Sequence, residues 1–272
     1  MHLLAIPYPA IDPVAFSLGP ISVKWYGLAY VAGLLLGWWY VKRLLSTPRL
    51  WPDAKPPFSA ELVDDLFIWV ALGVIVGGRL GHVLLYEPGQ YLSDPIQILM
   101  VHKGGMAFHG GALGTIAAMW LFAYRRGLVP LTVMDLVAAA VPFGLFFGRI
   151  ANFINAEVVG AVTTVPWAMV FPGWGPEPRH PSQLYEAMLE GAVLFFILRW
   201  LTHRRGALAG PGIVGGAFVG GYGAFRMFCE LFKHDEYQVF GALPVTTGMI
   251  YSIPMVIAGL LLVLHGRRSR PT

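Results

Sequence analysis

Residues 63–86 read V-D-D-L-F-I-W-V-A-L-G-V-I-V-G-G-R-L-G-H-V-L-L-Y, and this stretch decides the fold class. Two acids open it and Arg79 and His82 lie toward its end; the rest is apolar or glycine. About 20 such residues form a helix that is long enough to cross the hydrocarbon core of a bilayer. The two acids suit the N-terminus of a helix. The stretch therefore predicts a membrane-spanning helix with one charge, Arg79, inside it.

The composition of the whole chain points the same way. Its 272 residues are 56% hydrophobic and 12% charged, whereas charged residues make up about 25% of a soluble domain. We predict an all-α integral membrane protein that folds as a single polytopic domain over residues 1–272. The glycine-rich stretch 212–223 predicts close helix packing. The seven predicted spans cover about 22–41, 63–86, 106–123, 131–154, 182–201, 211–232 and 247–265.

The basic residues predict the orientation of these spans. Most of the 19 lysines and arginines follow the odd-numbered spans, and few follow the even-numbered ones. Because basic residues favour the cytoplasmic side, we expect the N-terminus outside and the C-terminus in the cytoplasm. The outside loops, about 87–105, 156–181 and 233–246, would then cap a pocket in the outer leaflet. The outside residues are Lys24, Lys103, Arg179 and Lys233.

Three arginines fall inside predicted spans: Arg79, Arg149 and Arg226. An arginine near the centre of a span costs about 2.5–3.5 kcal/mol on the insertion scale, so each must be paired, hydrated or exposed to a cavity. With His109 at the start of the third span, all four side chains are expected at a similar depth in the outer leaflet. Arginine suits phosphate because its planar fork binds two oxygens at once. The pattern predicts an anion site for a phospholipid headgroup.

Structural roles compete with this interpretation. Glu230 follows Arg226 by four residues, so the two can neutralise each other on one helix. Arg79 has no acid nearby in the sequence and can extend toward the headgroups. Arg149 has Asn152 on the same helix face but no nearby acid. A lone histidine in an apolar span, such as His109, is often a core residue.

The stretch R-H-P-S-Q-L-Y-E, residues 179–186, opens the fifth predicted span. Ser182 is expected to cap this helix, with Glu186 within its first turns. Capping does not explain Gln183 and Tyr185 beside them. Glu186 and Glu190 are like charges four residues apart, so we expect one of them to be paired with a membrane arginine or protonated.

Six motifs now combine into one resemblance. The chain resembles the phosphatidylglycerol–prolipoprotein diacylglyceryl transferases, membrane enzymes of bacterial lipoprotein maturation, over nearly its whole length. The likeness implies seven spans with the N-terminus outside, in the bacterial cytoplasmic (inner) membrane. The motifs are D-P-V-A-F-S-L-G-P-I-S-V-K-W-Y-G (12–27), G-G-R-L-G (77–81), G-G-M-A-F-H-G-G (104–111), G-R-I-A-N-F-I-N-A-E (148–157), R-H-P-S-Q-L-Y-E (179–186) and Y-G-A-F-R-M-F-C-E (222–230).

The resemblance implies an activity. Such an enzyme moves the diacylglyceryl group of phosphatidylglycerol onto the lipobox cysteine thiol in the signal peptide of a preprolipoprotein, releasing glycerol 1-phosphate. It assigns lipid binding to Arg149, a second essential arginine to Arg226 and the motif histidine to His109. An imidazole there suits the role of base for the thiol, and the alternative is that His109 only orients a substrate. The glycines beside His109 would let two lipid-like substrates approach. The further candidate substrate contacts are Tyr26, Arg79, Gly105, Gly110, Asn152, Glu157, Gln183, Tyr185, Glu186 and Glu230.

The chain departs from the family pattern at three positions. The family usually reads N-G-E where this chain has Ala156 between Asn155 and Glu157. It usually has an arginine at Ala161 and often a glutamine at Met249. These departures concern peripheral substrate contacts and leave His109, Arg149 and Arg226 unchanged.

Two other classes of function compete. A transporter would place basic residues at several depths, whereas the sequence clusters them in the outer half. A lipid-binding scaffold is excluded only by the motifs. We expect membrane lipids as partners and neither a cofactor nor nucleic acid. We also expect no metal, since the lone cysteine and scattered histidines offer no ligand spacing.

Overall fold

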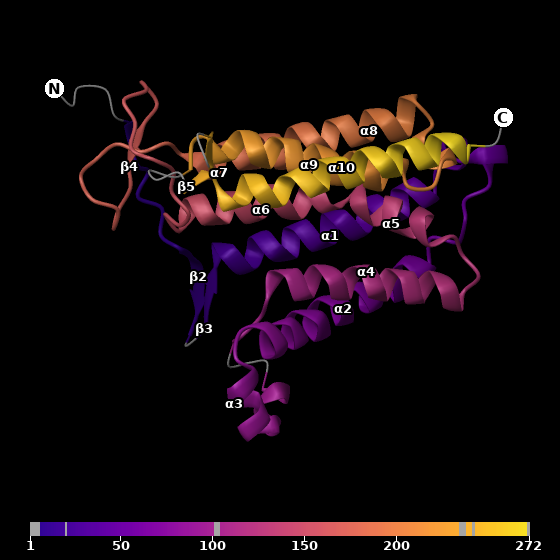
Figure 1. Cartoon of the computed structure of the whole chain (residues 1–272), viewed down its shortest axis with the longest axis horizontal. Helices are drawn as coiled ribbons and strands as arrows, with labels where there is room; N and C mark the ends of the chain where they lie inside the picture. Colours follow the sequence, from indigo (N-terminus) through magenta and orange to yellow (C-terminus); the bar gives the residue numbers. More distant parts are fainter. Residues whose placement is uncertain (1–5, 20, 101–103, 234–237, 241–242, 271–272) are drawn as a thin grey trace. The chain divides into compact units, whose positions relative to one another are not determined.

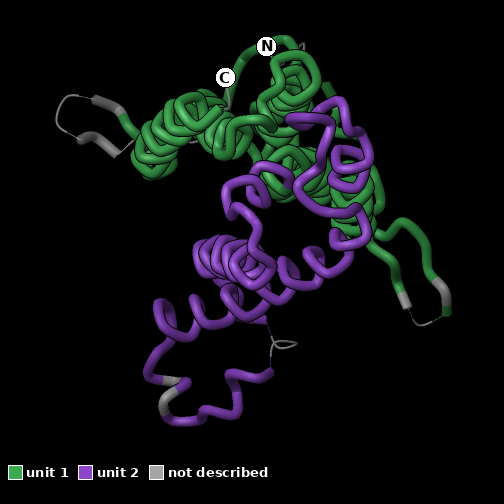
Figure 2. Tube along the Cα trace, turned by 90° about the vertical axis from the view of Figure 1, so that its right-hand side faces the viewer, with its two compact units in different colours: residues 1–40, 137–272 green, residues 41–136 purple. Residues whose placement is uncertain are grey.

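The computed structural model describes residues 6–19, 21–100, 104–233, 238–240 and 243–270 (Figure 1). Lys103 and parts of the predicted outside loops lie outside the described residues. The chain forms two compact units (Figure 2): unit 1 contains residues 1–40 and 137–272, and unit 2 contains residues 41–136.

The helices of unit 1 run alongside one another in Figure 1. Two long helices, α9 (Ile213–Glu230) and α10 (Thr247–Arg268), form an antiparallel pair. The elements α7, η5 and α8 follow one another without a break over residues 182–204, and η5 is a π-helical turn. A turn at 139–140 separates α5 from α6. The helices are α1 (Trp25–Leu45, in unit 1 through Tyr40), α6 (Val141–Ile154), α7 (Ser182–Glu186), η5 (Ala187–Val193), α8 (Leu194–Arg204), η6 (Ala207–Ala209), α9 (Ile213–Glu230) and α10 (Thr247–Arg268). The helix α5 (Pro130–Ala138) joins the two units in the sequence.

Short strands occupy the connecting segments of unit 1. β1 (Ile6–Pro7) pairs in parallel with β4 (Met169–Val170). The strands β2 (Val14–Leu18) and β3 (Ile21–Lys24) form an antiparallel hairpin, as do β5 (Gln238–Phe240) and β6 (Leu243–Val245). The predicted spans are therefore helical, as expected for an all-α chain. The described segments that connect them also contain three small two-stranded sheets, which the sequence did not predict.

Glycines set the spacing of α9 and α10. A Cβ atom added to Gly216 would lie 2.6 Å from the carbonyl oxygen of Gly259, and one added to Gly259 would lie 2.6 Å from the Cα of Gly220. Side chains therefore do not fit at these positions without moving the helices apart. The close packing predicted from the glycine-rich stretch is confirmed.

Unit 2 is built on the pair α2 (Leu62–Leu85) and α4 (Phe108–Arg125). Gly73 and Gly77 of α2 face Gly114 of α4, and a Cβ atom on Gly73 would lie 2.6 Å from the Gly114 carbonyl oxygen. We call this contact the glycine seam. Unit 2 also contains four shorter helices: η1 (Pro48–Leu50), η2 (Pro52–Ala54), α3 (Pro88–Ser93) and η3 (Pro95–Leu99).

The two acids that open α2 form ion pairs. Asp64 pairs with Lys42 at 2.9 Å, and Asp65 pairs with Arg126 at 2.5 Å. The prediction that these acids have a structural role is confirmed.

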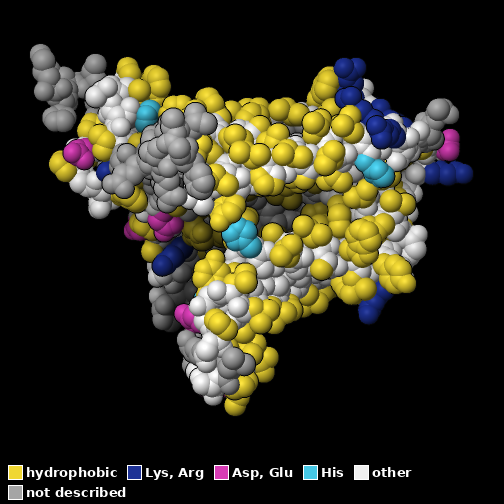
Figure 3. Space-filling view, in the orientation of Figure 1, with side chains coloured by type: hydrophobic (Ala, Val, Ile, Leu, Met, Phe, Trp, Pro, Cys, Tyr) yellow, Lys and Arg dark blue, Asp and Glu magenta, His cyan; other side chains and the backbone are white. Residues whose placement is uncertain are grey.

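Each predicted span coincides with one helix or with consecutive helices, and the ends shift by up to four residues. The fourth span is divided by a turn at residues 139–140, just before Pro142 in the first turn of α6. By length and composition, three described helices suit a membrane crossing: Leu62–Leu85, Pro130–Ile154 and Thr247–Arg268. The count of seven spans and their orientation stay predictions. Figure 3 shows hydrophobic side chains over α8, α9 and α10, with basic side chains where α8 and α10 end.

Candidate active site

Three glutamates are buried in unit 1 where α6, α7, η5 and α9 meet. Glu186 ends α7, Glu190 lies in η5 and Glu230 ends α9, and each is 0% exposed. A buried carboxylate needs a cationic or hydrogen-bonding partner. The partners come from α6, from α9 and from the residues after α9. We call the group of acids and their cations the charge cluster.

Arg149 of α6 contacts two of these acids. Its Nε lies 3.2 Å from Oε2 of Glu186, and its terminal nitrogen NH2 lies 3.6 Å from Oε2 of Glu190. The sequence shows no acid near Arg149, and the fold supplies two from another helix. The expectation that Glu186 or Glu190 pairs with a membrane arginine is confirmed for both.

Arg226 of α9 also holds two acids. Its NH1 donates to Glu186, and its NH2 lies 2.6 Å from Oε1 of Glu230. The pairing with Glu230 predicted from their spacing is confirmed, but it is only half of the environment of Arg226. The hydroxyl of Thr246 donates to the other oxygen of Glu230 at 2.8 Å. Gly248 leaves room for this carboxylate, because a Cβ atom there would lie 2.6 Å from its carbon.

Lys233 completes the charge cluster, and sequence reasoning missed it. Its Nζ lies 2.9 Å from Oε1 of Glu186. Lys233 was counted among the outside basic residues; its only sequence signal is its place three residues after Glu230. Burial lowers the pKa of Lys233, while the neighbouring carboxylate of Glu186 opposes that shift.

Among the described residues, the cluster combines three cations with three carboxylates. The carboxylates are buried, whereas the side chains of Arg149 and Arg226 keep 19% and 20% of their surface exposed. The two guanidinium groups are thus fixed by acids on one side and reachable on another. Such an arrangement can accept an anion without moving the arginines, which is the requirement for a preorganised phosphate site.

Glu190 has the poorest partners within this cluster. Within the part of the chain that the structure describes, neither of its carboxylate oxygens has a hydrogen-bond partner. Its contact with Arg149 is longer than the contacts of Glu186, and Glu186 itself is a like charge four residues away. Glu190 is therefore the carboxyl group of the cluster whose burial is least offset by local contacts.

Glu157 is held by amides at the end of α6. The Nδ2 atoms of Asn152 and Asn155 donate to its carboxylate at 3.2 and 3.4 Å, and the buried Gln183 donates to its backbone carbonyl at 2.7 Å. The predicted site residues Asn152, Glu157 and Gln183 are therefore brought together. Ala156 has φ +54°, in the left-handed region that favours glycine, and the family pattern has glycine there.

The helix α7 begins differently from the prediction. Pro181 takes the capping position, and the hydroxyl of Ser182 donates to the carbonyl of Val158 at 3.1 Å. The expectation that Ser182 caps the helix is wrong, because its side chain ties the helix to the preceding loop. Tyr185 accepts a hydrogen bond from Trp167 at 2.6 Å and lies 3.1 Å from Nδ1 of His180, so it braces the loop.

Tyr26 of α1 lies at the edge of this region. Its hydroxyl is 3.3 Å from the hydroxyl of Tyr30, and Tyr30 is within electrostatic range of Arg149 and Glu157. A phenol pair near a cation can contribute donors to an anion or to a polar headgroup.

In unit 2, Arg79 is surrounded by backbone carbonyls. It donates from Nε to Ile98 at 2.9 Å, from NH1 to Gly104 and Gly105 at 2.7 and 3.1 Å, and from NH2 to Gln97. We call these four acceptors the carbonyl cage. Arg79 is 5% exposed, so the expectation that it extends to the headgroups is wrong.

His109 follows this cage in the chain, as the second residue of α4, and it is exposed. Its glycine neighbours serve packing. A Cβ atom on Gly105 would lie 2.7 Å from Arg79, and one on Gly110 would lie 2.7 Å from the Cα of Gly81 in α2. The space beside these two predicted substrate contacts is filled by the protein itself.

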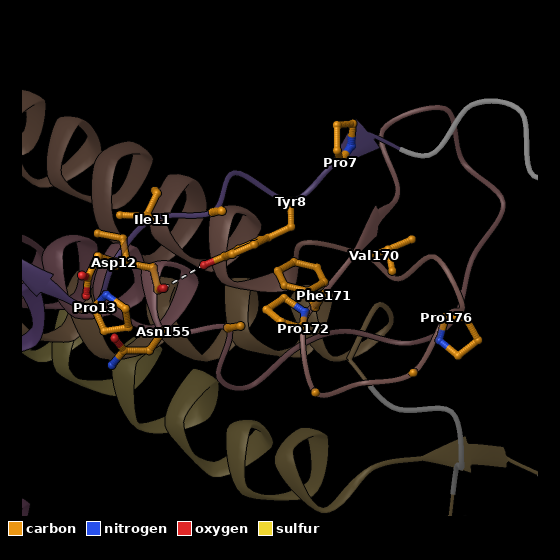
Figure 4. Close-up of a pocket in the computed structure, with 15 residues that line it drawn as sticks. Pro7, Tyr8, Ile11, Asp12, Pro13, Asn155, Val170, Phe171, Pro172 and Pro176 are labelled. Atoms are coloured by element: carbon orange, nitrogen blue, oxygen red, sulfur yellow. Dashed lines mark hydrogen bonds between the residues drawn. The ribbon is translucent and has the colours of Figure 1, made fainter.

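A separate cavity of about 1000 Å³ lies at the end of α6 (Figure 4). Proline-rich segments line it, and Tyr8 spans it to donate to the carbonyls of Phe153 and Ile154 at 2.7 Å. Asp12 and Asn155 are polar groups in its wall.

Known proteins match this chain closely. The profile of the family described as prolipoprotein diacylglyceryl transferase matches residues 13–265. Relatives named phosphatidylglycerol–prolipoprotein diacylglyceryl transferase include one from Rhizobium meliloti (strain 1021), 49% identical, covering 98% of this chain and 96% of the relative. Another, from Mesorhizobium japonicum, is 51% identical and covers 96% of this chain and 92% of its own length. One from Brucella canis is 51% identical over 97% of this chain and 95% of its own.

Proposed function

The chain belongs to the prolipoprotein diacylglyceryl transferase family, and we propose that its charge cluster binds the phosphate of the donor lipid. The protein is a transferase of lipoprotein biosynthesis that moves the diacylglyceryl group of phosphatidylglycerol to a prolipoprotein. It is a membrane protein. Its proposed location is the bacterial cytoplasmic (inner) membrane, with seven spans and the N-terminus outside.

The observation that supports the phosphate site is the pairing of two arginines with buried acids. Arg149 and Arg226 are fixed by Glu186 and by a second acid each, yet about a fifth of each side chain stays exposed. Fixed guanidinium donors bind phosphate oxygens in pairs. They also cost little reorganisation when charge develops on the departing phosphate.

The proposed reaction is a displacement at the glycerol carbon next to the phosphate. The lipobox cysteine of the prolipoprotein attacks that carbon, a sulfur–carbon bond forms, and the carbon–oxygen bond to phosphate breaks. The leaving group is glycerol 1-phosphate, whose new charge Arg149 and Arg226 would stabilise. The chain's own Cys229 is buried and takes no part.

The thiol proton must also be removed. A free thiol has a pKa of about 8.5, so only a few per cent is thiolate at neutral pH. An imidazole with an unperturbed pKa of about 6.5 is suited to accept this proton. We propose His109 for this role because of its motif and its exposure.

Other side chains would position the substrates. Glu157, held by Asn152 and Asn155, and the Tyr26–Tyr30 pair offer polar groups for the headgroup glycerol. The family has an arginine at the position of Ala161. In this chain Arg179, from another segment, lies beside that position, because it donates to the carbonyl of the adjacent Gly160 at 3.2 Å.

The test is mass spectrometry of a lipobox peptide incubated with the purified protein and phosphatidylglycerol. Wild type should add a diacylglyceryl mass to the cysteine, and a peptide with serine in place of cysteine should stay unmodified. Arg149→Ala should lose the transfer, and His109→Gln should lose most of it. Retained turnover in His109→Gln would exclude the base role.

No transfer by a folded wild-type protein that still binds phosphatidylglycerol would overturn the enzymatic proposal. The protein would then be a lipid-binding scaffold. Vesicles that contain phosphatidylcholine instead of phosphatidylglycerol control for non-specific lipid association.

A further inference from the structure

We propose that Arg79 is a positioning residue that fixes the segment leading into His109, and that it is not a ligand of the lipid phosphate. The inference rests on the proposed function, since it concerns how the proposed base is held. It starts from the carbonyl cage, in which four backbone oxygens accept hydrogen bonds from one guanidinium.

The cage leaves Arg79 little capacity for a second ligand. A guanidinium has five N–H donors. Arg79 donates four hydrogen bonds to backbone oxygens. The ring of Tyr91 lies 5.0 Å from its central carbon. Arg79 is 5% exposed, whereas Arg149 and Arg226 stay about one-fifth exposed. A phosphate would have to displace carbonyls that already accept hydrogen bonds from the guanidinium.

The acceptors tie two places in the sequence together. Gln97 and Ile98 lie in η3, whereas Gly104 and Gly105 lie directly before α4. Arg79 therefore joins η3 to the two glycines directly before α4. Hydrogen bonds of this kind hold the residues that lead into a functional site without contacting the substrate.

The backbone around Gly105 is shaped to receive the guanidinium. Gly104 and Gly105 have φ values of +88° and +78°, which side chains disfavour. A Cβ atom on Gly105 would lie 2.7 Å from both Arg79 and His82. The amide of Ala107 then donates to the carbonyl of Gly78 at 2.9 Å, beside Arg79 in α2.

These contacts end where His109 begins. Ala107 is the residue before α4, and its own side chain makes no capping hydrogen bond. The start of α4 is thus held by the cage, by the Ala107–Gly78 hydrogen bond and by the glycine seam. Of these three contacts, only the carbonyl cage depends on a single side chain, that of Arg79. Replacing Arg79 should therefore move the imidazole of His109.

The experiment compares Arg79→Lys and Arg79→Gln with Arg149→Lys and Arg149→Gln in the peptide-transfer assay. Both Arg79 variants should lower kcat by about tenfold or more and leave KM for phosphatidylglycerol within about twofold, because misplacement of a catalytic group affects turnover. Lysine should not rescue Arg79, because an ammonium cannot reach four fixed carbonyls. At Arg149, lysine should rescue KM in part, because charge matters there.

Two further measurements separate positioning from general stability. Hydrogen exchange at the amides of residues 104–111 should accelerate in Arg79→Lys, and the rate at which diethylpyrocarbonate modifies His109 should change. The melting temperature is measured alongside, and kinetics are recorded well below it.

A KM that rises about fivefold or more in Arg79→Gln and recovers in Arg79→Lys would make Arg79 a lipid ligand and overturn the inference. Lower melting temperatures with unchanged kcat, exchange and modification rates would also overturn it, in favour of a purely structural role. If wild type itself transfers nothing, the proposed function fails, and the exchange and modification rates still decide whether Arg79 positions His109.

Discussion

The two units bury their arginines in opposite ways. In unit 2, Arg79 meets neutral backbone carbonyls and is almost wholly enclosed. In unit 1, Arg149 and Arg226 meet carboxylates and stay partly exposed. Carbonyls use up donors without adding charge, whereas carboxylates hold the guanidinium and leave other donors available. The comparison teaches that the partners of a buried arginine, rather than its depth, indicate its role.

The strongest way to break this comparison is to remove the acid that serves three cations. Glu186→Leu leaves Arg149, Arg226 and Lys233 without their shared carboxylate. Losing one partner of a buried ion pair costs about 3–5 kcal/mol, so we expect little folded protein. Size-exclusion chromatography and thermal unfolding in detergent measure this. Glu177→Gln, which removes an exposed acid of the same unit, is the control. A normal yield for Glu186→Leu would show that the charge cluster is not needed for the fold.

A matched pair of alanine substitutions sharpens the comparison on the side of the carbonyl cage. Gly104→Ala and Gly105→Ala both place alanine at a positive φ, which costs about 1–2 kcal/mol. Only at Gly105 does the new Cβ meet Arg79; at Gly104 nothing lies within 4 Å. We expect Gly105→Ala to lose about 1–3 kcal/mol more stability than Gly104→Ala, from overpacking. Equal melting temperatures for the two variants would show that the cage yields to an extra methyl group.

Changing Glu190 tests the charge balance with a smaller effect. Glu190→Gln removes a carboxyl group whose oxygens have no hydrogen-bond partner among the described residues, and at a pH where Glu190 is ionised it leaves the cluster with one excess positive charge. An added charge at this range is worth about 1 kcal/mol, so KM for phosphatidylglycerol should fall about three- to tenfold. The matching change in unit 2, Glu87→Gln beside His82, should leave KM unchanged. A higher KM in Glu190→Gln would show that the carboxylate itself contacts the substrate.

The smallest effect contrasts the backbones of the two regions. The cage has glycines at its positive φ angles, whereas the loop after α6 has Ala156 at φ +54°. Ala156→Gly relieves that conformation at some cost in chain entropy, so we expect a gain of about 0.5–1 kcal/mol in the free energy of unfolding. Thermal unfolding measures it. Ala161→Gly, at an alanine without positive φ, should instead lower stability. A loss in both variants would mean that Ala156 makes packing contacts worth more than its strain.

Sequence reasoning predicted the parts of this protein that follow from hydrophobic length and helical spacing. The helices appear where apolar stretches predict them, and Glu230 pairs with Arg226 because four residues make one turn. The sequence predicted that Glu186 or Glu190 pairs with a membrane arginine, because the two like charges lie four residues apart. It did not predict that this arginine is Arg149.

Other features have no such signal. Backbone carbonyls surround Arg79, and a carbonyl is present at every residue, so no pattern marks the cage. Lys233 joins the cluster because the chain turns back after α9, which periodicity does not predict. Ser182 was assigned to a helix cap because its type favours caps, but the proline before it takes that position.

The charge cluster also orders the events of biosynthesis. Arg149 is translated before Glu186 and Glu190, and Arg226 follows Glu186 by 40 residues. While the ribosome is still adding the later helices, the arginine of α6 has neither carboxylate available, and an unpaired arginine is costly in lipid. We therefore expect α6 to remain beside the insertion machinery until α7 and η5 arrive. A chain truncated after α6 should be extracted and degraded, whereas one that extends beyond α9 should be retained.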